Sequence, residues 1–424
     1  MRAVHWSKLP NAKLGESVWA IIDVDGFAVD LALTEELFAV PQPKAQVKPM
    51  GVRGRAAAFG GAVDASASAG GASKSGVGAS KPVGGAATMS DKPTLHVISV
   101  QRANNVGIFL KRTSKLLTCD QLCKAVVRLE EAVLEPELLD SILSNLPPET
   151  EAKALRALKG VDIADLTPPE RFCFEMARHP RLRSMLHALK QRHQLPQGLG
   201  RAKSALATVA EAARQLMDST ALRALFGSLL AHGNYLNAGT ARAGARGVKL
   251  DALDKARSVK SADGKLTLLE HACAATCLAR AQLLTELGGV RSACKVPLLD
   301  VIRIIQELEE GVDVVGQEIA LCPLPGLDED VAADATGGAG GPGAEEHRVA
   351  VRFRSAMAPF HSDMRRGLDE LTAHRDETRA LLKRLAGWLG EDPNQANPDA
   401  ILKVCADFID TAIGCGTVPE ESDE

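Results

Sequence analysis

Apolar residues recur every three or four positions along most of this chain, the spacing that places them on one face of an α-helix. Two long series stand out. The first is Leu298, Val301, Ile305, Leu308, Val312, Val315, Ile319 and Cys322. The second is Phe353, Met357, Phe360, Met364, Leu371, Thr378, Leu381, Leu385 and Trp388, with Gly367 and His374 at its weaker positions. Such 4-3 seams predict an antiparallel coiled-coil hairpin, with a kink at Pro359 in its second arm.

A third amphipathic stretch, 222–236, carries an unusual glycine. At 100° per residue, one face collects Leu222, Leu225, Phe226, Leu229, Gly233 and Leu236. A glycine inside a helix costs about 1 kcal/mol relative to alanine, so a packing reason is expected. Because Gly233 lies within the apolar stripe, it leaves a hollow on that face. We expect this hollow to accept an aromatic side chain from elsewhere.

The chain leaves that helix through a glycine-spaced basic segment. Residues 238–266 hold seven basic side chains against three acidic ones, a local charge of +4. The basic residues are Arg242, Arg246, Lys249, Lys255, Arg257, Lys260 and Lys265. A basic loop of this kind favours an acidic partner surface, although composition alone fits a solvated loop equally well.

The stretch "VQRANNVGIFLKR", residues 100–112, contains an apolar residue out of place. Val100, Ala103, Val106, Gly107 and Leu110 share one helical face, whereas Ile108 falls among polar neighbours. Ile108 is therefore either a packing residue for another element or an exposed contact, and the pattern does not distinguish the two.

Two segments are of low complexity. Residues 41–92 are rich in Gly, Ala, Ser and Pro, and they predict a flexible linker with a root-mean-square span of about 40 Å. Residues 323–344 predict an acidic, glycine-rich loop. The linker isolates an N-terminal piece that is too short for its own core yet holds Trp6 and Trp19. These tryptophans must bury against their own chain or against a partner subunit.

Composition excludes several classes of function. The chain of 424 residues is 46% hydrophobic and 24% charged, as in soluble globular proteins, with only 3% aromatic residues for its core. Its net charge of −3 gives no overall nucleic-acid or membrane signature. No apolar run approaches the roughly 20 residues that span a bilayer, and no signal peptide is evident.

No catalytic or metal-binding pattern is apparent either. The nine cysteines lack disulfide or metal-ligand spacing, and the i,i+4 pairs Cys119/Cys123 and Cys273/Cys277 are expected to be ordinary thiols. Neither glycine-rich segment matches a phosphate-binding loop. His232, beside Gly233, is expected to be a packing or surface residue. We therefore expect no enzymatic activity, no cofactor and no metal.

Several of these stretches together resemble one family. "GNYLNAGTARAGARGVKLDALDKARSVKSADGKLTLLEHA" (233–272) is similar to the signature of the formin homology 2 domain, and "QRANNVGIFLKR" (101–112) resembles that family's Arg-Ala-x-Asn-Ile-x-Ile-x-Leu helix. Weaker likenesses are "NLPPETEAKAL", "LTPPERFCFEM", "VHWSKL…SVWA" and "GWLGED". They occur in the family's order and cover nearly the whole chain outside the two low-complexity segments.

The resemblance implies an elongated all-α fold and a head-to-tail ring dimer. Its parts would be a lasso (1–40), the linker (41–92), a knob (93–165), coiled-coil and post helices (166–322), the acidic loop (323–344), and a C-terminal coiled-coil helix with the post end (345–424). In the family, the lasso of one subunit encircles the post of the other. By that likeness Trp6 and Trp19 would enter the partner's post near Gly233, Asn234, Tyr235, Leu236 and Asn237.

The resemblance also implies a function. Ile108 aligns with the family's knob isoleucine, which enters an apolar cleft of actin, and Lys260 aligns with its post lysine, with Arg242 and Lys249 as further actin contacts. The expected function is nucleation of unbranched actin filaments and processive residence at barbed ends, in the cytoplasmic actin cytoskeleton. The alternative is a dimeric coiled-coil scaffold that binds filament sides or microtubules without nucleating.

The sequence departs from the family pattern at two points. Val248 stands where the family usually has a phenylalanine, so looser packing of the post is expected there. No proline-rich segment precedes the lasso. Profilin is therefore expected as an indirect partner only, through a proline-rich segment elsewhere.

Overall fold

The computed structural model describes residues 2–40, 98–158, 163–324 and 342–415. Among these residues the regular structure is helical and no β-strand occurs, although Lys8 with Val248 and Lys260 with Thr267 form isolated β-bridges. The prediction of an all-α fold is confirmed. The linker predicted over 41–92 lies outside the described residues, as does most of the loop predicted over 323–344.

The lasso contains four short elements: α1 (Asn11–Leu14), η1 (Val18–Ala20), η2 (Val24–Gly26) and α2 (Leu31–Phe38). The helices that precede the long α8 are α3 (Val100–Thr113), α4 (Cys119–Val127), α5 (Pro136–Asn145), α6 (Glu149–Ala157), η3 (Ile163–Asp165) and α7 (Pro168–Ala177), and the name knob is used below for all of them. The long helices are α8 (Leu182–Asp218), α14 (Leu298–Ala320) and α16 (Pro342–Trp388). The post helices are α9 (Thr220–Leu236), α10 (Asp251–Ser258), α11 (Leu268–Thr276), α12 (Arg280–Leu287), α13 (Val290–Ala293) and α17 (Pro398–Cys415).

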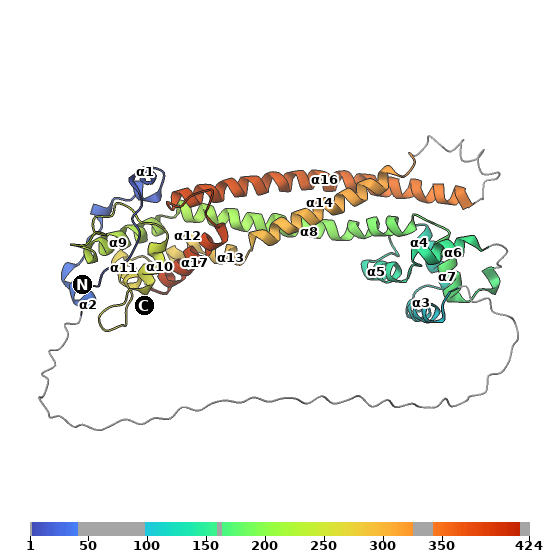
Figure 1. The fold of residues 1–424 in the computed structure, drawn as a ribbon, viewed down its shortest axis with the longest axis horizontal. Coiled ribbons are helices and arrows are strands. Elements are labelled where there is room, and N and C mark those ends of the chain that lie inside the picture. Colours follow the sequence, from blue (N-terminus) through green and yellow to red (C-terminus); the bar gives the residue numbers. More distant parts are fainter. Residues whose placement is uncertain (1, 41–97, 159–162, 325–341, 416–424) are drawn as a thin grey trace, which may run out of the picture. The chain divides into compact units, whose positions relative to one another are not determined.

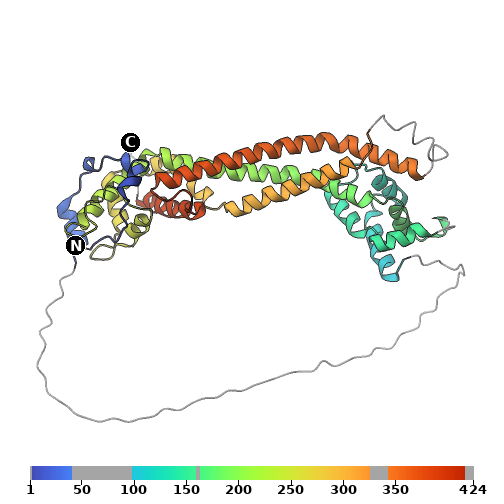
Figure 2. The same cartoon turned by 45° about the horizontal axis from the view of Figure 1, so that its top comes forward.

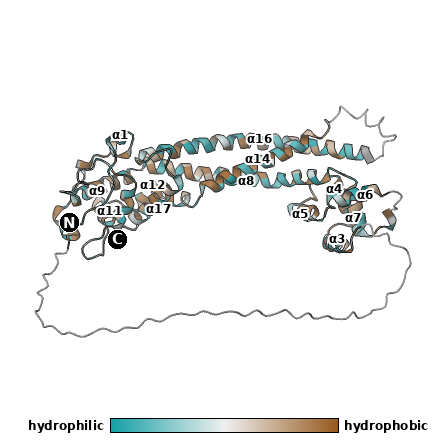
Figure 3. Cartoon of the chain, viewed as in Figure 1, coloured by the Kyte–Doolittle hydropathy of each residue, from teal (hydrophilic) through white to brown (hydrophobic). Residues whose placement is uncertain are grey.

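Helices α8, α14 and α16 lie side by side in both views (Figures 1 and 2). The predicted seams are buried over most of their length: Val301, Ile305, Leu308, Val312 and Val315 of α14, and Phe353, Met357, Met364 and Leu371 of α16. Figure 3 shows the accompanying alternation of hydrophilic and hydrophobic residues along these helices. The sequence predicted a hairpin of two helices, but α8 packs against both of them, so the region is a bundle of three helices.

Helix α8 accounts for both a confirmed and a displaced position of the second seam. Gly367 is buried as predicted, and a Cβ there would lie 2.7 Å from a methyl carbon of Leu199 on α8. Towards the end of α16, Leu382 is buried and Leu381 only half-buried. A strict seven-residue repeat does not match the 3.6 residues per turn of an α-helix, so the apolar positions rotate gradually around α16. Helix α8 supplies a second surface against which the rotated positions pack. Helix α16 continues through Pro359 without a break.

The knob helices pack around a core of their own, which also takes in the start of α8 and parts of α14 and α16. Side-chain caps fix where α3 and α4 begin. Ser99 accepts a hydrogen bond from the Arg102 backbone N–H at the start of α3, and Thr118 forms a capping box with Gln121 before α4. The Ser99 cap thus fixes the start of α3, the helix that carries Ile108.

The post helices and the lasso share a separate core. The apolar face predicted for 222–236 is confirmed, since every member of that face is buried in α9. Helix α9 is also buried outside this face, because Ser228 and His232 are enclosed. This central helix is therefore the element against which the lasso and the other post helices pack.

Candidate functional site

The lasso is seated on the post helices of its own chain, and the hollow predicted at Gly233 is present. Trp6 fills this hollow, since a Cβ at Gly233 would lie 2.2 Å from its Cη2 and Cζ3 atoms. The Trp6 indole N–H points to the Arg242 carbonyl oxygen at 3.4 Å. Trp6 is buried. Gly233 therefore forms a socket for one lasso aromatic.

Two further glycine sockets hold lasso aromatics. A Cβ at Gly247 would lie 2.7 Å from Cγ of Trp19, and one at Gly227 would lie 2.1 Å from Cε2 of Phe27. Trp19 also stacks on Phe226, with ring centroids 5.5 Å apart. Trp19 was predicted near 233–237, and no role was predicted for Phe27. The sequence pattern indicated a hollow at Gly233 alone, because Gly227 and Gly247 were not recognised as sockets.

Backbone hydrogen bonds fix the lasso alongside residues 247–249. The Leu9 N–H donates to the Gly247 carbonyl at 2.9 Å, and the Lys249 N–H donates to the Ser7 carbonyl at 3.0 Å. Asn237, which is fully buried, accepts from the Val4 N–H at 2.8 Å through Oδ1. Together with the sockets, these bonds define the register of the lasso on the post.

The remaining residues of the 233–237 run have distinct roles. The Asn234 side chain closes its own loop, since Nδ2 donates to the Ala245 carbonyl and Oδ1 accepts from the Ala245 N–H, both at 2.8 Å. The Tyr235 hydroxyl donates to Glu35 of the lasso at 2.6 Å, and this bond raises the pKa of the tyrosine. Leu236 is buried in the core shared with the lasso.

The basic segment was predicted as a loop, but helix α10 occupies Asp251–Ser258, so only the parts before and after it are loops. The loop before α10 faces the lasso mainly with its backbone. Gly239 and Gly244 have φ of 78° and 63°, the left-handed region that favours glycine, which accounts for the glycine spacing. The Lys8 ammonium donates to the Ala243 carbonyl at 2.6 Å. By contrast, the side chains of Arg242 and Lys249 are exposed. The charged groups are thus left available for contact with another molecule.

Lys260 lies in a turn held by its neighbours. The Ser261 hydroxyl donates to Asp263 at 2.5 Å and accepts from the Leu266 N–H at 3.0 Å. The hydrogen bond from Ser261 and a second from the Lys265 N–H lower the pKa of Asp263. This turn fixes the backbone at Lys260, while the lysine side chain remains exposed.

Ile108 is an exposed apolar residue. It is 69% exposed on α3, whereas Val106, Phe109 and Leu110 are buried on the opposite side. Ile108 is therefore not a packing residue for another described element, and its role as a contact stays a prediction. Val100, which the sequence analysis placed on the buried face, is 67% exposed because it is the first residue of the helix and extends beyond the core.

Val248 is buried, and a small open pocket of about 10 Å³ lies beside it among Val18, Trp19 and Phe226. The looser packing expected at Val248 stays a prediction.

Two histidines lie at the joint between lasso and post. The rings of His232 and His271 meet edge to face with centroids 4.9 Å apart. His232 Nδ1 lies 2.8 Å from the Ser228 carbonyl oxygen, and His271 Nε2 lies 3.2 Å from the Thr34 hydroxyl of the lasso. Burial lowers the pKa of both, and His232 lowers that of His271 further, against the opposing effect of Asp30.

This arrangement predicts that lasso docking weakens as the pH falls below about 6.5. With the lasso docked, His271 resists protonation, and loss of its contacts with Thr34 and Phe38 of the lasso returns its pKa towards the ordinary value. The contribution of His271 to lasso docking is therefore fully present above about pH 6.5 and is lost as the pH falls towards its lowered pKa, by at most about 1.4 kcal/mol per pH unit. Amide hydrogen exchange of Leu31–Phe38, at pH 7.5 and at pH 5.5, measures this loss.

A His271→Phe variant separates this effect from general acid sensitivity. The phenyl ring keeps the contact with Phe38, whose centroid lies 5.7 Å from that of His271, but it does not titrate. Exchange of Leu31–Phe38 in the variant should depend less on pH than in the parent. Equal pH dependence in the two proteins would contradict the assignment.

No group of three or more His, Cys, Asp or Glu side chains suited to a metal ion occurs in the described part of the chain. All nine cysteines are described and free. Burial raises the pKa of Cys173, Cys273 and Cys405 to about 12. Over the same described ranges, no helix is both long and apolar enough to cross a membrane.

These surfaces define a helical interaction domain: an N-terminal strap in glycine sockets, an exposed basic loop and a knob with a projecting isoleucine. The chain belongs to the formin homology 2 domain family, because the family model described as Formin Homology 2 Domain matches residues 1–411.

Curated relatives agree with this assignment. The chain is 24% identical over 417 residues to "Formin-like protein 3" of Oryza sativa subsp. japonica, covering 96% of this chain and 29% of the relative. It is 24% identical over 421 residues to "Formin-like protein 14" of Arabidopsis thaliana, covering 97% of this chain and 30% of that relative. It is 26% identical over 329 residues to "Formin-like protein 6" of Oryza sativa subsp. japonica, covering 77% and 22%. The chain thus spans less than a third of the length of these relatives.

Proposed function

We propose that this chain is a non-enzymatic actin assembly domain that nucleates unbranched filaments and stays at their barbed ends as a homodimer. The observation that carries the proposal is Ile108, 69% exposed on α3 at the position of the family's knob isoleucine. An isolated isoleucine on a polar helical face gains free energy only by burial against a partner.

The basic loop supplies the second contact. Lys260, Arg242 and Lys249 are exposed and would meet an acidic surface of actin. Such pairs are screened by salt, whereas burial of Ile108 in an apolar cleft is not. The two contacts would hold actin subunits in filament-like order and offset the unfavourable first steps of nucleation.

The dimer would form by exchange of the lasso. In this proposal Trp6, Trp19 and Phe27 of one subunit occupy the sockets of the other, with the same contacts that they make within one chain. Support comes from the sockets themselves, which accept a segment joined to the rest of the chain only through residues 41–97. The resulting ring would have two equivalent joints.

The test is pyrene-actin assembly with the parent chain, Ile108→Ala and the matched control Val100→Ala. Both variants remove an exposed apolar side chain from the same helix. The parent and Val100→Ala should shorten the lag, and Ile108→Ala should lose most of that effect, by roughly tenfold or more, as expected for a central interface residue.

Two outcomes would overturn this proposal. If Ile108→Ala shortens the lag as well as Val100→Ala does, Ile108 is not an actin contact. If no protein alters the lag although all of them co-sediment with filaments, the chain is a filament-binding scaffold. Binding to microtubules in place of actin would point to the same alternative.

A further inference from the structure

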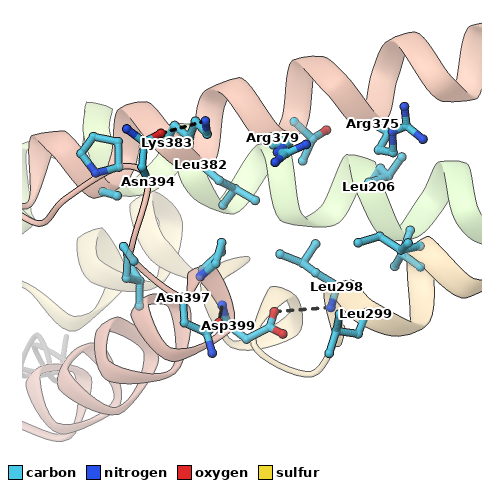
Figure 4. Close-up of a pocket in the computed structure, with 18 residues that line it drawn as sticks. Leu206, Leu298, Leu299, Arg375, Arg379, Leu382, Lys383, Asn394, Asn397 and Asp399 are labelled. Atoms are coloured by element: carbon cyan, nitrogen blue, oxygen red, sulfur yellow. Dashed lines mark hydrogen bonds between the residues drawn. The ribbon is translucent and has the colours of Figure 1, made fainter.

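A groove of about 730 Å³ opens where the long helices meet the post (Figure 4), and none of the socket glycines lines it. Its walls come from α8, α14, α16, the segment after α16, and the start of α17. The volume lies within the range of about 300–1,000 Å³ that is usual for ligand-binding clefts.

The inner part of the groove is apolar, and so is one rim. Leu206, Val301 and Leu382 are buried and line its floor. On the α14 rim, Leu299 is 76% exposed and Ile302 is 44% exposed. Two large apolar side chains, three residues apart on one helix and beside an apolar cleft, form a surface that favours association.

The opposite rim is cationic. Arg375, Arg379 and Lys383 follow one another at four-residue intervals on α16, with about 6 Å of helix rise between successive members. Arg375 pairs with Asp376 at 3.0 Å, and the Lys383 ammonium donates to Asn394 Oδ1 at 3.1 Å. Arg379 is exposed and has no ion pair within the described chain.

The carboxylates of the groove do not balance this row. Among the described residues that line it, Asp399 is the one acidic side chain. Its Oδ1 accepts a hydrogen bond from the Leu298 N–H at 3.4 Å (Figure 4). The groove thus combines an apolar floor and rim with a net positive edge.

We propose that this groove binds an acidic amphipathic helix of a partner protein. The apolar face of such a helix would cover Leu299, Ile302 and the floor, and carboxylates at every fourth position would face Arg375, Arg379 and Lys383. Helix-in-groove recognition uses anchors at this spacing, and charge complementarity selects the acidic partner. This site uses neither Ile108 nor the basic loop, so it goes beyond the actin-binding proposal.

The probe is a fluorescein-labelled helical peptide of about 16 residues, long enough to hold some helix in water, with leucines on one face and a glutamate at every fourth position beside them. Fluorescence anisotropy measures its binding to the full chain. A second peptide with glutamine in place of each glutamate tests the role of charge.

The variant Arg379→Gln/Lys383→Gln is compared with Arg348→Gln/Arg366→Gln. The control removes the same charge from two exposed positions of the same helix outside the groove. The groove variant should bind the glutamate peptide roughly tenfold more weakly than the parent, and the control should bind like the parent. Leu299→Ala/Ile302→Ala should weaken binding of both peptides.

Equal binding by the groove variant and the control would overturn the proposal. So would failure of the parent chain to bind the glutamate peptide, or equal affinity for the glutamine peptide. Binding to vesicles containing phosphatidylserine, without binding to the peptide, would assign the groove to an anionic lipid surface instead.

Discussion

A chain carrying Gly233→Leu is expected to lose its docked lasso. A Cβ at Gly233 would lie 2.2 Å from Trp6, and the glycine is inside α9, so the backbone has no room to retreat. By helix propensity alone, leucine would stabilise α9 by about 0.5–1 kcal/mol, so any loss must come from the lasso. Expelling a buried tryptophan should cost about 3–5 kcal/mol of the docking free energy.

Light scattering and tryptophan fluorescence measure this result. Within the proposed ring the variant should become a monomer, and its Trp6 emission should shift towards that of exposed tryptophan. Gly200→Leu is the matched control, because Gly200 is also helical, in α8, and a Cβ added there would meet no atom within 4 Å. The control should remain like the parent.

A double-mutant cycle tests whether Trp6 is the cause. In a Trp6→Ala background the socket is already empty, so Gly233→Leu should add little further loss and its leucine should partly refill the space. The Trp6→Ala/Trp19→Ala chain should itself be monomeric. A dimer that survives both tryptophan substitutions unchanged would refute the lasso exchange, and full additivity in the cycle would refute the pairing of Trp6 with Gly233.

Arg102→Met is expected to lower the stability of the knob, although Arg102 is not part of the exposed contact surface. Its guanidinium Nη2 donates to the Asn145 and Leu146 carbonyls, both at 2.6 Å, and lies between α3 and the end of α5. Its Nε lies 3.6 Å from Glu151. Both side chains are partly buried, with 18% of Arg102 and 22% of Glu151 exposed. Leaving the two carbonyls and the carboxylate without their partner should cost roughly 1–3 kcal/mol.

Hydrogen exchange in α3 and α5, together with thermal unfolding, measures the effect. Arg112→Met is the control: Arg112 lies on the same helix, is exposed, and donates to the Ser141 hydroxyl at 2.9 Å. Its loss should cost roughly 0.5 kcal/mol or less. Actin assembly should fail with Arg102→Met because Ile108 loses its support. Identical unfolding of the two variants would contradict this role for Arg102.

The sequence was sufficient to predict those features that depend on the spacing of residues within one helix. The seam of α14, the buried face of α9 and the hollow at Gly233 all follow from the spacing of residues within a single element. Ile108 was found in the same way, as an apolar residue on a polar face, but whether it was covered depended on the neighbours of α3. Periodicity reports which face of a helix is apolar, not what lies against it.

Features that join distant segments were missed. Nothing in the seams of α14 and α16 shows that helix α8 packs against both of them. Nothing in the sequence near Phe27 pairs it with Gly227. His232 is a packing residue, as one of its two predicted roles; what the sequence did not predict is its partner His271, which contacts the lasso residue Thr34. Such pairings depend on how the chain returns in space, which local spacing does not encode.

The glycine sockets have a consequence for how assembly is controlled. A socket cannot distinguish an aromatic of its own chain from the same aromatic of another, so two closed monomers and one exchanged ring contain equal numbers of identical joints. In the proposed exchange, the choice between these two forms depends on whether residues 41–97 allow the lasso to reach the sockets of its own post, because an accessible lasso of the same chain competes with the partner's through its effective concentration. The connection, and not the sockets, would then decide between a closed monomer and a ring.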